Sequence, residues 1–114
     1  MIVYGIPNCN SVKKARDWFA LNNLAVDFHD YKKLGISRQK LIEWSKLVGW
    51  ELLLNKKGTT WKSISLEEQK KIKNQSSAID LMLDKTSLIK RPVVEYNNRI
   101  WIGFDEKLFE VDFK

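Results

Sequence analysis

The side chain best placed to do chemistry in this sequence is Cys9, the only cysteine among 114 residues. It follows a Gly-Ile-Pro-Asn run at residues 5–8, which is turn-forming, and precedes a segment with the apolar spacing of a helix. The first amides of a helix lack intrahelical partners and, with the helix dipole, favour an anion. We therefore expect a lowered thiol pKa and a reactive thiolate. The alternative, a free cysteine filling core space, fits poorly with neighbours that are loop and cap residues.

A second candidate is Arg91, which directly precedes Pro92 at the start of a predicted strand. The guanidinium presents a planar fork of donors that matches an oxyanion or a carboxylate. Pro92 opens the strand where the missing N–H matters least, and an X-Pro bond in this position can be cis. The alternative for Arg91 is a surface side chain at a strand end.

Other residues that often do chemistry have a plainer interpretation here. His29 is the only histidine, and without a spaced partner it makes neither a metal site nor a catalytic triad. We expect no metal site. The five tryptophans are interpreted as packing residues rather than as a platform for stacking bases, and we expect no direct contact with nucleic acid.

The elements that must position Cys9 and Arg91 follow from hydrophobic periodicity. A strand–helix–strand unit at the start favours two parallel strands, and Asn97-Asn98 suits a tight hairpin turn. This order predicts an α/β fold, a thioredoxin-like mixed sheet, in which the start of the strand at Pro92 lies beside the loop of Cys9. The predicted elements outside the middle of the chain are strands at 2–4, 25–29, 92–96 and 99–102, a helix at 10–21, and a last helix with Leu108, Phe109 and Val111 as its apolar residues.

The middle of the chain is predicted to be helical. Ser37 caps a helix to about residue 47, and Gly49 closes it. Ser65 and Glu68 match a capping box for a helix to about residue 74. A further helix opens at Ser76, with Ile79, Met82 and Leu83 as its buried stripe. Leu52–Leu54 packs before a polar connection at residues 55–60. We expect a single domain over 1–114, with this helical insertion at roughly 35–86.

Composition limits the class of protein. The 20 basic and 14 acidic residues give a net charge of +6, which suits an anionic partner, although a solvated lysine-rich surface explains it as well. One cysteine excludes an internally disulfide-stapled domain. No apolar run is long enough to span a membrane, and the N-terminus does not have the pattern of a signal peptide. We expect a cytoplasmic monomer that does not bind membranes.

Five sets of residues, in order along the chain, carry a resemblance to a known family. They are Gly5–Ala15 (Gly-Ile-Pro-Asn-Cys-Asn-Ser-Val-Lys-Lys-Ala), Phe28–Tyr31, Leu53–Asn55 with Gly58–Trp61, Ile89–Pro92, and Gly103-Phe104. Together they resemble the ArsC/Spx/YffB family, the arsenate-reductase-related branch of thioredoxin-like proteins, and its YffB-like subgroup in particular. The resemblance implies a thioredoxin fold with a helical insertion, a cis proline at Pro92, and Cys9 and Arg91 as the catalytic residues.

The resemblance also implies a function: a glutathione-dependent thiol oxidoreductase that uses the single N-terminal cysteine as nucleophile. Glutathione would be the co-substrate, no cofactor would stay bound, and glutaredoxin is a further expected partner. With no second cysteine, the mixed disulfide must be released by an external thiol. The residues expected to bind substrate or glutathione are Asn10, Ser11, Lys13, Asn55, Lys56 and Pro92.

The chain departs from two branches of the family. Arsenate reductases hold their oxyanion with further arginines, but the matching places here are Asn55 and the neighbourhood of Ile102, while Arg99 is displaced. Spx regulators carry a CxxC redox switch, whose second place is Val12 here. The alternatives are an Spx-like transcriptional regulator that binds RNA polymerase, a true arsenate reductase, and a fold whose catalysis has lapsed.

Overall fold

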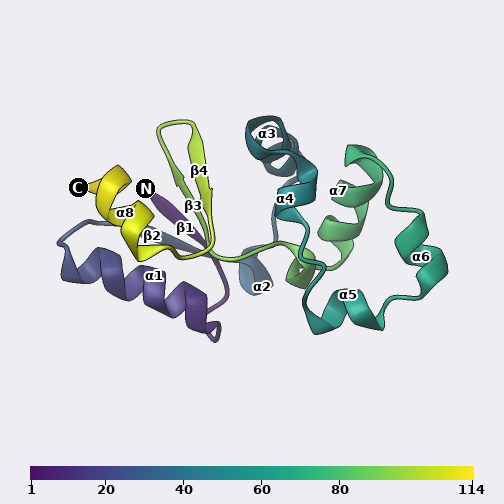
Figure 1. The fold of residues 1–114 in the computed structure, drawn as a ribbon, viewed down its shortest axis with the longest axis horizontal. Coiled ribbons are helices and arrows are strands. Elements are labelled where there is room, and N and C mark those ends of the chain that lie inside the picture. The colour runs from purple at the N-terminus through teal and green to yellow at the C-terminus, as the bar shows by residue number, and fades with distance from the viewer. The chain divides into compact units, whose positions relative to one another are not determined.

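The computed structural model describes all 114 residues and contains two compact units (Figure 1). The first unit is built from Met1–Tyr31 and Arg91–Lys114, and the second from Lys32–Lys90. The second unit contains the helical insertion expected at roughly 35–86, and the prediction of a single domain stays a prediction. Each helix is too short or too polar to cross a membrane.

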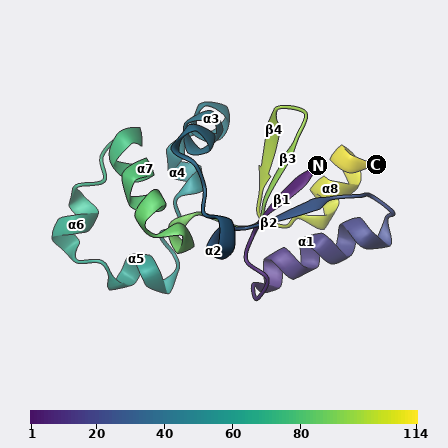
Figure 2. The same ribbon diagram turned by 180° about the vertical axis from the view of Figure 1, so that it is seen from behind.

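The first unit is organised by a mixed sheet of four strands in the order β2-β1-β3-β4. Strand β1 lies inside the sheet, parallel to β2 and antiparallel to β3 (Figures 1 and 2). This arrangement confirms the predicted α/β fold with a thioredoxin-like mixed sheet. The strands are β1 (Ile2–Gly5), β2 (Asp27–Asp30), β3 (Val93–Tyr96) and β4 (Arg99–Ile102).

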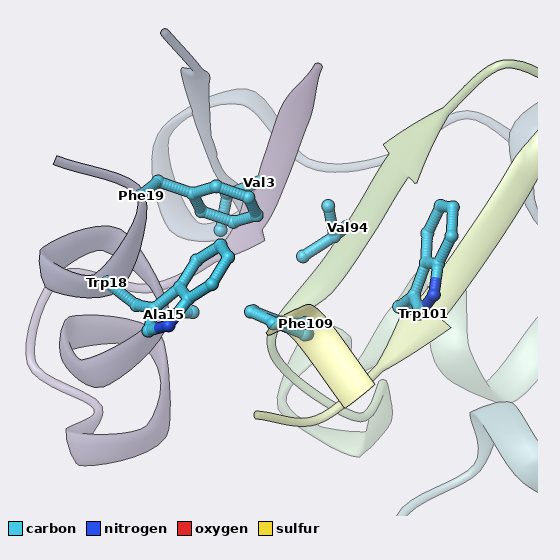
Figure 3. Close-up of a cluster of buried hydrophobic side chains, with 7 residues drawn as sticks. All are labelled: Val3, Ala15, Trp18, Phe19, Val94, Trp101 and Phe109. Carbon is cyan, nitrogen blue, oxygen red and sulfur yellow. The ribbon is translucent and has the colours of Figure 1, made fainter. Parts of the chain in front are cut away.

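Two helices, α1 (Asn10–Leu21) and α8 (Glu106–Phe113), cover the same face of this sheet. Helix α1 has the bounds that its apolar periodicity predicts. Its buried face meets alternate residues of the strands and one phenylalanine of α8, and large aromatic rings fill most of this layer. The cluster, shown in Figure 3, consists of Val3, Ala15, Trp18, Phe19, Val94, Trp101 and Phe109.

The contact between β1 and α1 is unusually close at Gly5, the last residue of the strand. A Cβ atom added there would lie 2.5 Å from Cγ2 of Val12, which is itself fully buried. Real side chains do not approach so closely. Glycine is therefore required where the strand leads into the loop that carries Cys9.

The C-terminal hairpin turns as predicted, because Asn97 and Asn98 have φ values of 51° and 59°, the region a tight two-residue turn requires. The apolar stripe predicted for the last helix is wrong in part. Phe109 is buried, but Leu108 and Val111 are 44% and 76% exposed. Residues three apart share a helix face, so these two point together toward solvent. The core stripe instead runs from Phe109 to Phe113, whose ring centroids are 5.1 Å apart.

Helices make up most of the second unit. The predicted caps are present: Ser37 and Ser65 each accept a hydrogen bond from a backbone N–H of the following helix. The helix after Ser65 ends sooner than predicted, because Asn74 caps the next helix instead. The helices are α2 (Tyr31–Leu34), α3 (Arg38–Val48), α4 (Trp50–Leu53), α5 (Thr59–Ser63), α6 (Leu66–Lys70), α7 (Gln75–Asp84) and the 3-10 turn η1 (Thr86–Leu88). Helix α2 begins at Tyr31, which belongs to the first unit.

The second unit has buried residues of its own. Helices α3, α4 and α7 each contribute buried residues, whereas α5 and α6 contribute none. Helix α3 packs against both α4 and α7. Leu83, predicted to be buried, is half-exposed. The buried apolar residues of this unit are Leu41, Trp44, Leu53, Leu54, Ala78, Ile79, Met82, Leu88 and Ile89.

Candidate functional site

Cys9 lies where the loop after β1 becomes helix α1, and it is the N-cap residue of that helix. Its backbone is extended, with φ −110° and ψ 126°, while its carbonyl accepts the first helical hydrogen bond from the N–H of Lys13 at 2.9 Å. The thiol is half-buried and forms no disulfide. This is the position that the sequence predicts.

Several charges and dipoles act on the thiol of Cys9. Burial raises its pKa, but the backbone N–H groups of Val12 and Ser11 and the guanidinium of Arg91 lower the pKa by more. The net pKa is therefore below the ordinary value for a cysteine. The thiol makes no capping hydrogen bond of the kind that a serine or aspartate makes. The amides thus act through the weaker interaction that sulfur accepts, which strengthens when the sulfur is ionised.

Arg91 reaches this site from the far end of the chain. The peptide bond between Arg91 and Pro92 is cis, as the sequence prediction allowed. The Pro92 carbonyl accepts a hydrogen bond from the N–H of Gly103 at 2.8 Å, which fastens the start of β3 to the end of β4. The Arg91 side chain hydrogen-bonds the thiol of Cys9 and adds a Coulombic attraction to the thiolate.

The remaining predicted residues of the first unit line the start of α1. Asn10, Ser11 and Lys13 are all exposed. Ser11 acts on the thiol through its backbone amide. The Lys13 ammonium lies 3.4 Å from the Asp17 carboxylate, one helical turn further on.

Asn55 and Lys56 belong to the second unit. The N–H of Asn55 donates to the carbonyl of Leu88 at 2.7 Å, and its side-chain oxygen accepts from the N–H of Lys57 at 3.1 Å. The ammonium of Lys56 lies 5.4 Å from the centroid of the Trp61 ring. Asn55 therefore has a structural role in holding the loop between α4 and α5.

Sequence reasoning missed two contributors to the site. The first is the amide of Val12, although a signal existed: an N-cap side chain normally accepts from the second or third residue after it, here Ser11 and Val12. The second is Tyr31, which is 2% exposed and whose hydroxyl has no hydrogen-bond partner. Tyr31 ends the Phe28–Tyr31 set that carries the family resemblance, but no local pattern predicts its burial.

Tyr31 is one of three neighbouring rings on β1, β2 and the residue after β2, of which only Tyr4 and Tyr31 are stacked. Its ring centroid is 6.2 Å from those of Tyr4 and His29, which are 4.8 Å from each other. Burial raises the pKa of Tyr31 well above its usual value, and the nearby Tyr4 raises it further, against a smaller lowering by Arg91. The hydroxyl therefore stays protonated at neutral pH and can act as a donor beside the arginine.

The assembled group suits thiol chemistry. A thiolate held at a helix start beside a guanidinium can attack the sulfur of a disulfide or another soft electrophile. The guanidinium can also hold a carboxylate or an oxyanion. No three His, Cys, Asp or Glu side chains gather in a way that could hold a metal ion.

Comparison with known proteins agrees with this geometry. The sequence model of the ArsC family matches residues 4–111. An uncharacterized protein of Haemophilus influenzae is 36% identical over 97% of this chain and 96% of its own length. The global transcriptional regulator Spx of Streptococcus agalactiae is 24% identical over 88% of this chain and 73% of its own length.

Solved structures give the same result. A YffB protein superposes with a TM-score of 0.91 at 40% identity, covering 96% of both chains. An arsenate reductase (ArsC) related protein of Brucella melitensis superposes with a TM-score of 0.78 at 39% identity, covering 99% of this chain and 93% of that one. The resemblance inferred from the sequence motifs is therefore confirmed over nearly the whole chain.

Proposed function

Because this chain belongs to the ArsC family, we propose that it is a glutathione-dependent thiol oxidoreductase in which Cys9 is the nucleophile. The observation that carries the proposal is the position of Cys9 at the N-cap of α1. There the Val12 and Ser11 amides and the Arg91 guanidinium lower the pKa of the thiol. A thiol that merely filled space would be buried among apolar groups, and its pKa would be raised.

In the first step the thiolate of Cys9 attacks the glutathione sulfur of a disulfide between glutathione and a substrate thiol. The old S–S bond breaks, the substrate leaves as a thiolate and takes a proton from water, and Cys9 is left joined to glutathione. A lowered pKa favours this step, because the thiolate fraction at neutral pH rises faster than the intrinsic nucleophilicity falls.

Arg91 acts on both sides of this step. Before it, the guanidinium stabilises the Cys9 thiolate. After it, the sulfur is neutral, so the same fork of donors can hold a carboxylate of the attached glutathione. We place the remaining contacts to glutathione or substrate at Asn10, Ser11, Lys13 and Pro92 in the first unit.

The second step must use an external thiol, because the chain has one cysteine. A second glutathione thiolate attacks the Cys9–glutathione disulfide, which releases oxidised glutathione and restores the Cys9 thiolate. Glutaredoxin could take the adduct in its place by the same exchange. Glutathione is thus a co-substrate, and the cycle needs no bound cofactor.

The test is the rate at which oxidised glutathione forms an adduct on Cys9, followed by intact mass. The variants are Cys9→Ser, Arg91→Ala and Arg99→Ala, the last removing an arginine that lies over the Trp101 ring at 4.6 Å. We expect no adduct with Cys9→Ser and unchanged kinetics with Arg99→Ala. Arg91→Ala should slow the reaction about tenfold, the effect of losing one charge-assisted hydrogen bond. An adduct that forms as fast without Arg91 as with it would contradict the proposal.

A regulator that binds RNA polymerase is the second candidate, favoured by the relatives named Spx at 24–26% identity. Against a redox-switched regulator, the second place of the CxxC switch is occupied by the buried Val12. Purified RNA polymerase applied to the immobilised protein separates the two candidates. Retention of polymerase together with no turnover of glutathione would favour the regulator.

Arsenate reduction is the narrowest alternative, suggested by the arsenate-reductase-related neighbours. The position expected for a late oxyanion-binding arginine holds Ile102, a half-buried residue of β4. We therefore expect arsenate to cause no oxidation of glutathione beyond that seen with Cys9→Ser. Arsenate-dependent oxidation by the wild-type protein alone would instead favour this alternative.

A further inference from the structure

A groove of about 530 Å³ lies in the first unit along one side of α1. Its helical wall is formed by Lys13, Arg16, Asp17 and Ala20. Its other wall comes from β2, the outer strand of the sheet, and from the segment that leads into it. The volume falls in the range of ligand-binding clefts, which is about 300–1,000 Å³.

Cys9 does not line the groove, but two residues close to it along the chain, Pro7 and Lys13, do. Pro7, two residues before Cys9, forms its near end. Along the helix, Cys9 stands four residues before Lys13 and seven before Arg16, which places all three positions on one stripe of the helix surface. At 1.5 Å per residue, the stripe from Lys13 to Ala20 is about 10 Å long. A peptide whose cysteine sulfur comes close to Cys9 during the exchange can therefore extend along this stripe.

More than half of the residues that line the groove are apolar. They are Pro7, Ala20, Leu24, Val26 and Phe28. Glutathione has no apolar side chain, so it has nothing to bury against them. The groove therefore suits the substrate half of the disulfide between glutathione and a substrate thiol, provided that this half presents apolar side chains.

The rim of the groove carries one cation with no acidic partner. The Lys13 ammonium is satisfied by Asp17 at 3.4 Å. The guanidinium of Arg16 lies 4.0 Å from the centroid of the Phe28 ring and forms no ion pair with a carboxylate. The edge of this guanidinium is thus open to an acidic group, while its face lies over the apolar Phe28 ring.

We propose that this groove binds the peptide segment next to the cysteine in a glutathionylated protein substrate, and that it selects segments with apolar side chains and an acidic residue. The inference rests on the proposed function, since it assigns the leaving group of the first step. The length of about 10 Å accommodates about three extended residues. Arg16 is the residue that determines specificity, because it binds the acidic residue of the segment. The cysteine thiolate of the leaving peptide takes its proton from water.

Binding can be tested without any chemistry at sulfur. The probes are fluorescent peptides with serine in place of cysteine, symmetric about it so that chain direction is immaterial. The acidic apolar probe is Leu-Phe-Glu-Ser-Glu-Phe-Leu. Its controls replace the glutamates by lysines or the apolar residues by serines. By polarisation, we expect the acidic apolar probe to bind up to about fivefold more tightly than the lysine control, the upper limit for one exposed ion pair. It should also bind more tightly than the control that lacks apolar residues.

Charge reversal identifies the residue responsible. Arg16→Glu and Lys14→Glu change the net charge equally, and both residues are exposed on α1, but Lys14 does not line the groove. We expect Arg16→Glu to remove the preference for glutamate over lysine and Lys14→Glu to keep it. Equal loss in the two variants would mean that only long-range charge matters, and would overturn the inference.

The glutathionylated versions of the same peptides then test the reaction. We expect Cys9 to deglutathionylate the acidic apolar peptide about fivefold faster than the controls, with Arg16→Glu affecting this rate but not the rate with oxidised glutathione. Reaction with oxidised glutathione and no preference among peptides overturns this inference alone. Failure of Cys9 to react with oxidised glutathione overturns the proposed function, and binding by the serine peptides would still assign the groove.

Discussion

Replacing Gly5 by alanine should lower the stability of the fold and raise the pKa of the Cys9 thiol. The added methyl group would lie 2.5 Å from Cγ2 of Val12, about 1 Å inside ordinary van der Waals contact. Val12 is fully buried and cannot swing into solvent. Either its side chain or the start of α1 must move, and the backbone N–H of Val12 is one of the groups that lower the pKa of Cys9.

The size of the effect follows from the cost of overpacking. Inserting a methyl group into a packed interior costs about 1–3 kcal/mol. For a chain of this length, each kcal/mol lowers Tm by about 3–5 °C, so Gly5→Ala should lower it by about 3–15 °C. If the helix start shifts, the Val12 amide moves away from the sulfur and the pKa of Cys9 rises toward the ordinary thiol value.

The assay is urea unfolding followed by tryptophan fluorescence, paired with the pH dependence of thiolate absorbance. Val12→Ala, alone and combined with Gly5→Ala, completes a double-mutant cycle. The smaller side chain makes room for the added methyl, so the two losses of unfolding free energy should not add. The double variant should lose at least about 1 kcal/mol less than the sum of the losses in the two single variants. Additive losses, or a Gly5→Ala protein as stable as the wild type, would refute the close-contact argument.

Three further predictions concern single groups. The alkylation rate of Cys9 should rise with pH through a midpoint below the ordinary thiol value of about 8.5, and Arg91→Ala should move this midpoint upward because the thiolate loses its cation; an unmoved midpoint in iodoacetamide kinetics argues otherwise. Tyr31→Phe should raise the unfolding free energy by about 1 kcal/mol, because it removes a buried hydroxyl without a partner. A lower unfolding free energy in urea would instead mean that the hydroxyl has a hydrogen-bond partner. Asp105→Ala should lower the unfolding free energy by about 0.5–2 kcal/mol, because the Asp105 carboxylate accepts a hydrogen bond from the N–H of Leu108 at 3.1 Å. Asp105→Asn should unfold in urea like the wild type.

The longer elements were predictable because their patterns repeat over several turns or follow defined turn chemistry. Asn10–Leu21 shows its helix in the spacing of its apolar residues, and Asn97 and Asn98 mark the hairpin. Helices α2, α4 and α5 have four or five residues each, too few for a periodic pattern. Their stability comes from packing, since a single isolated turn does not pay for its nucleation.

The site was predictable where its chemistry is local. Cys9 can be placed from the turn residues before it and the helix after it, and the amide of Val12 follows from the rule for N-caps. Arg91 is different, because the contact with Cys9 depends on β3 pairing with β1 across most of the sequence. The burial of Tyr31 likewise depends on long-range packing, which no local pattern encodes.

The first unit is assembled from the two ends of the chain, with β1 paired to β2 nearby and to β3 far away in sequence. During synthesis, β1 therefore emerges from the ribosome long before its second neighbour exists. At about 5–20 residues per second, the delay from Tyr31 to Tyr96 is roughly 3 to 13 s. Over that time the nascent Cys9 lacks the Arg91 guanidinium. The contribution of Arg91 to the lowered pKa of Cys9 is therefore absent until β3 has been synthesised and has paired with β1.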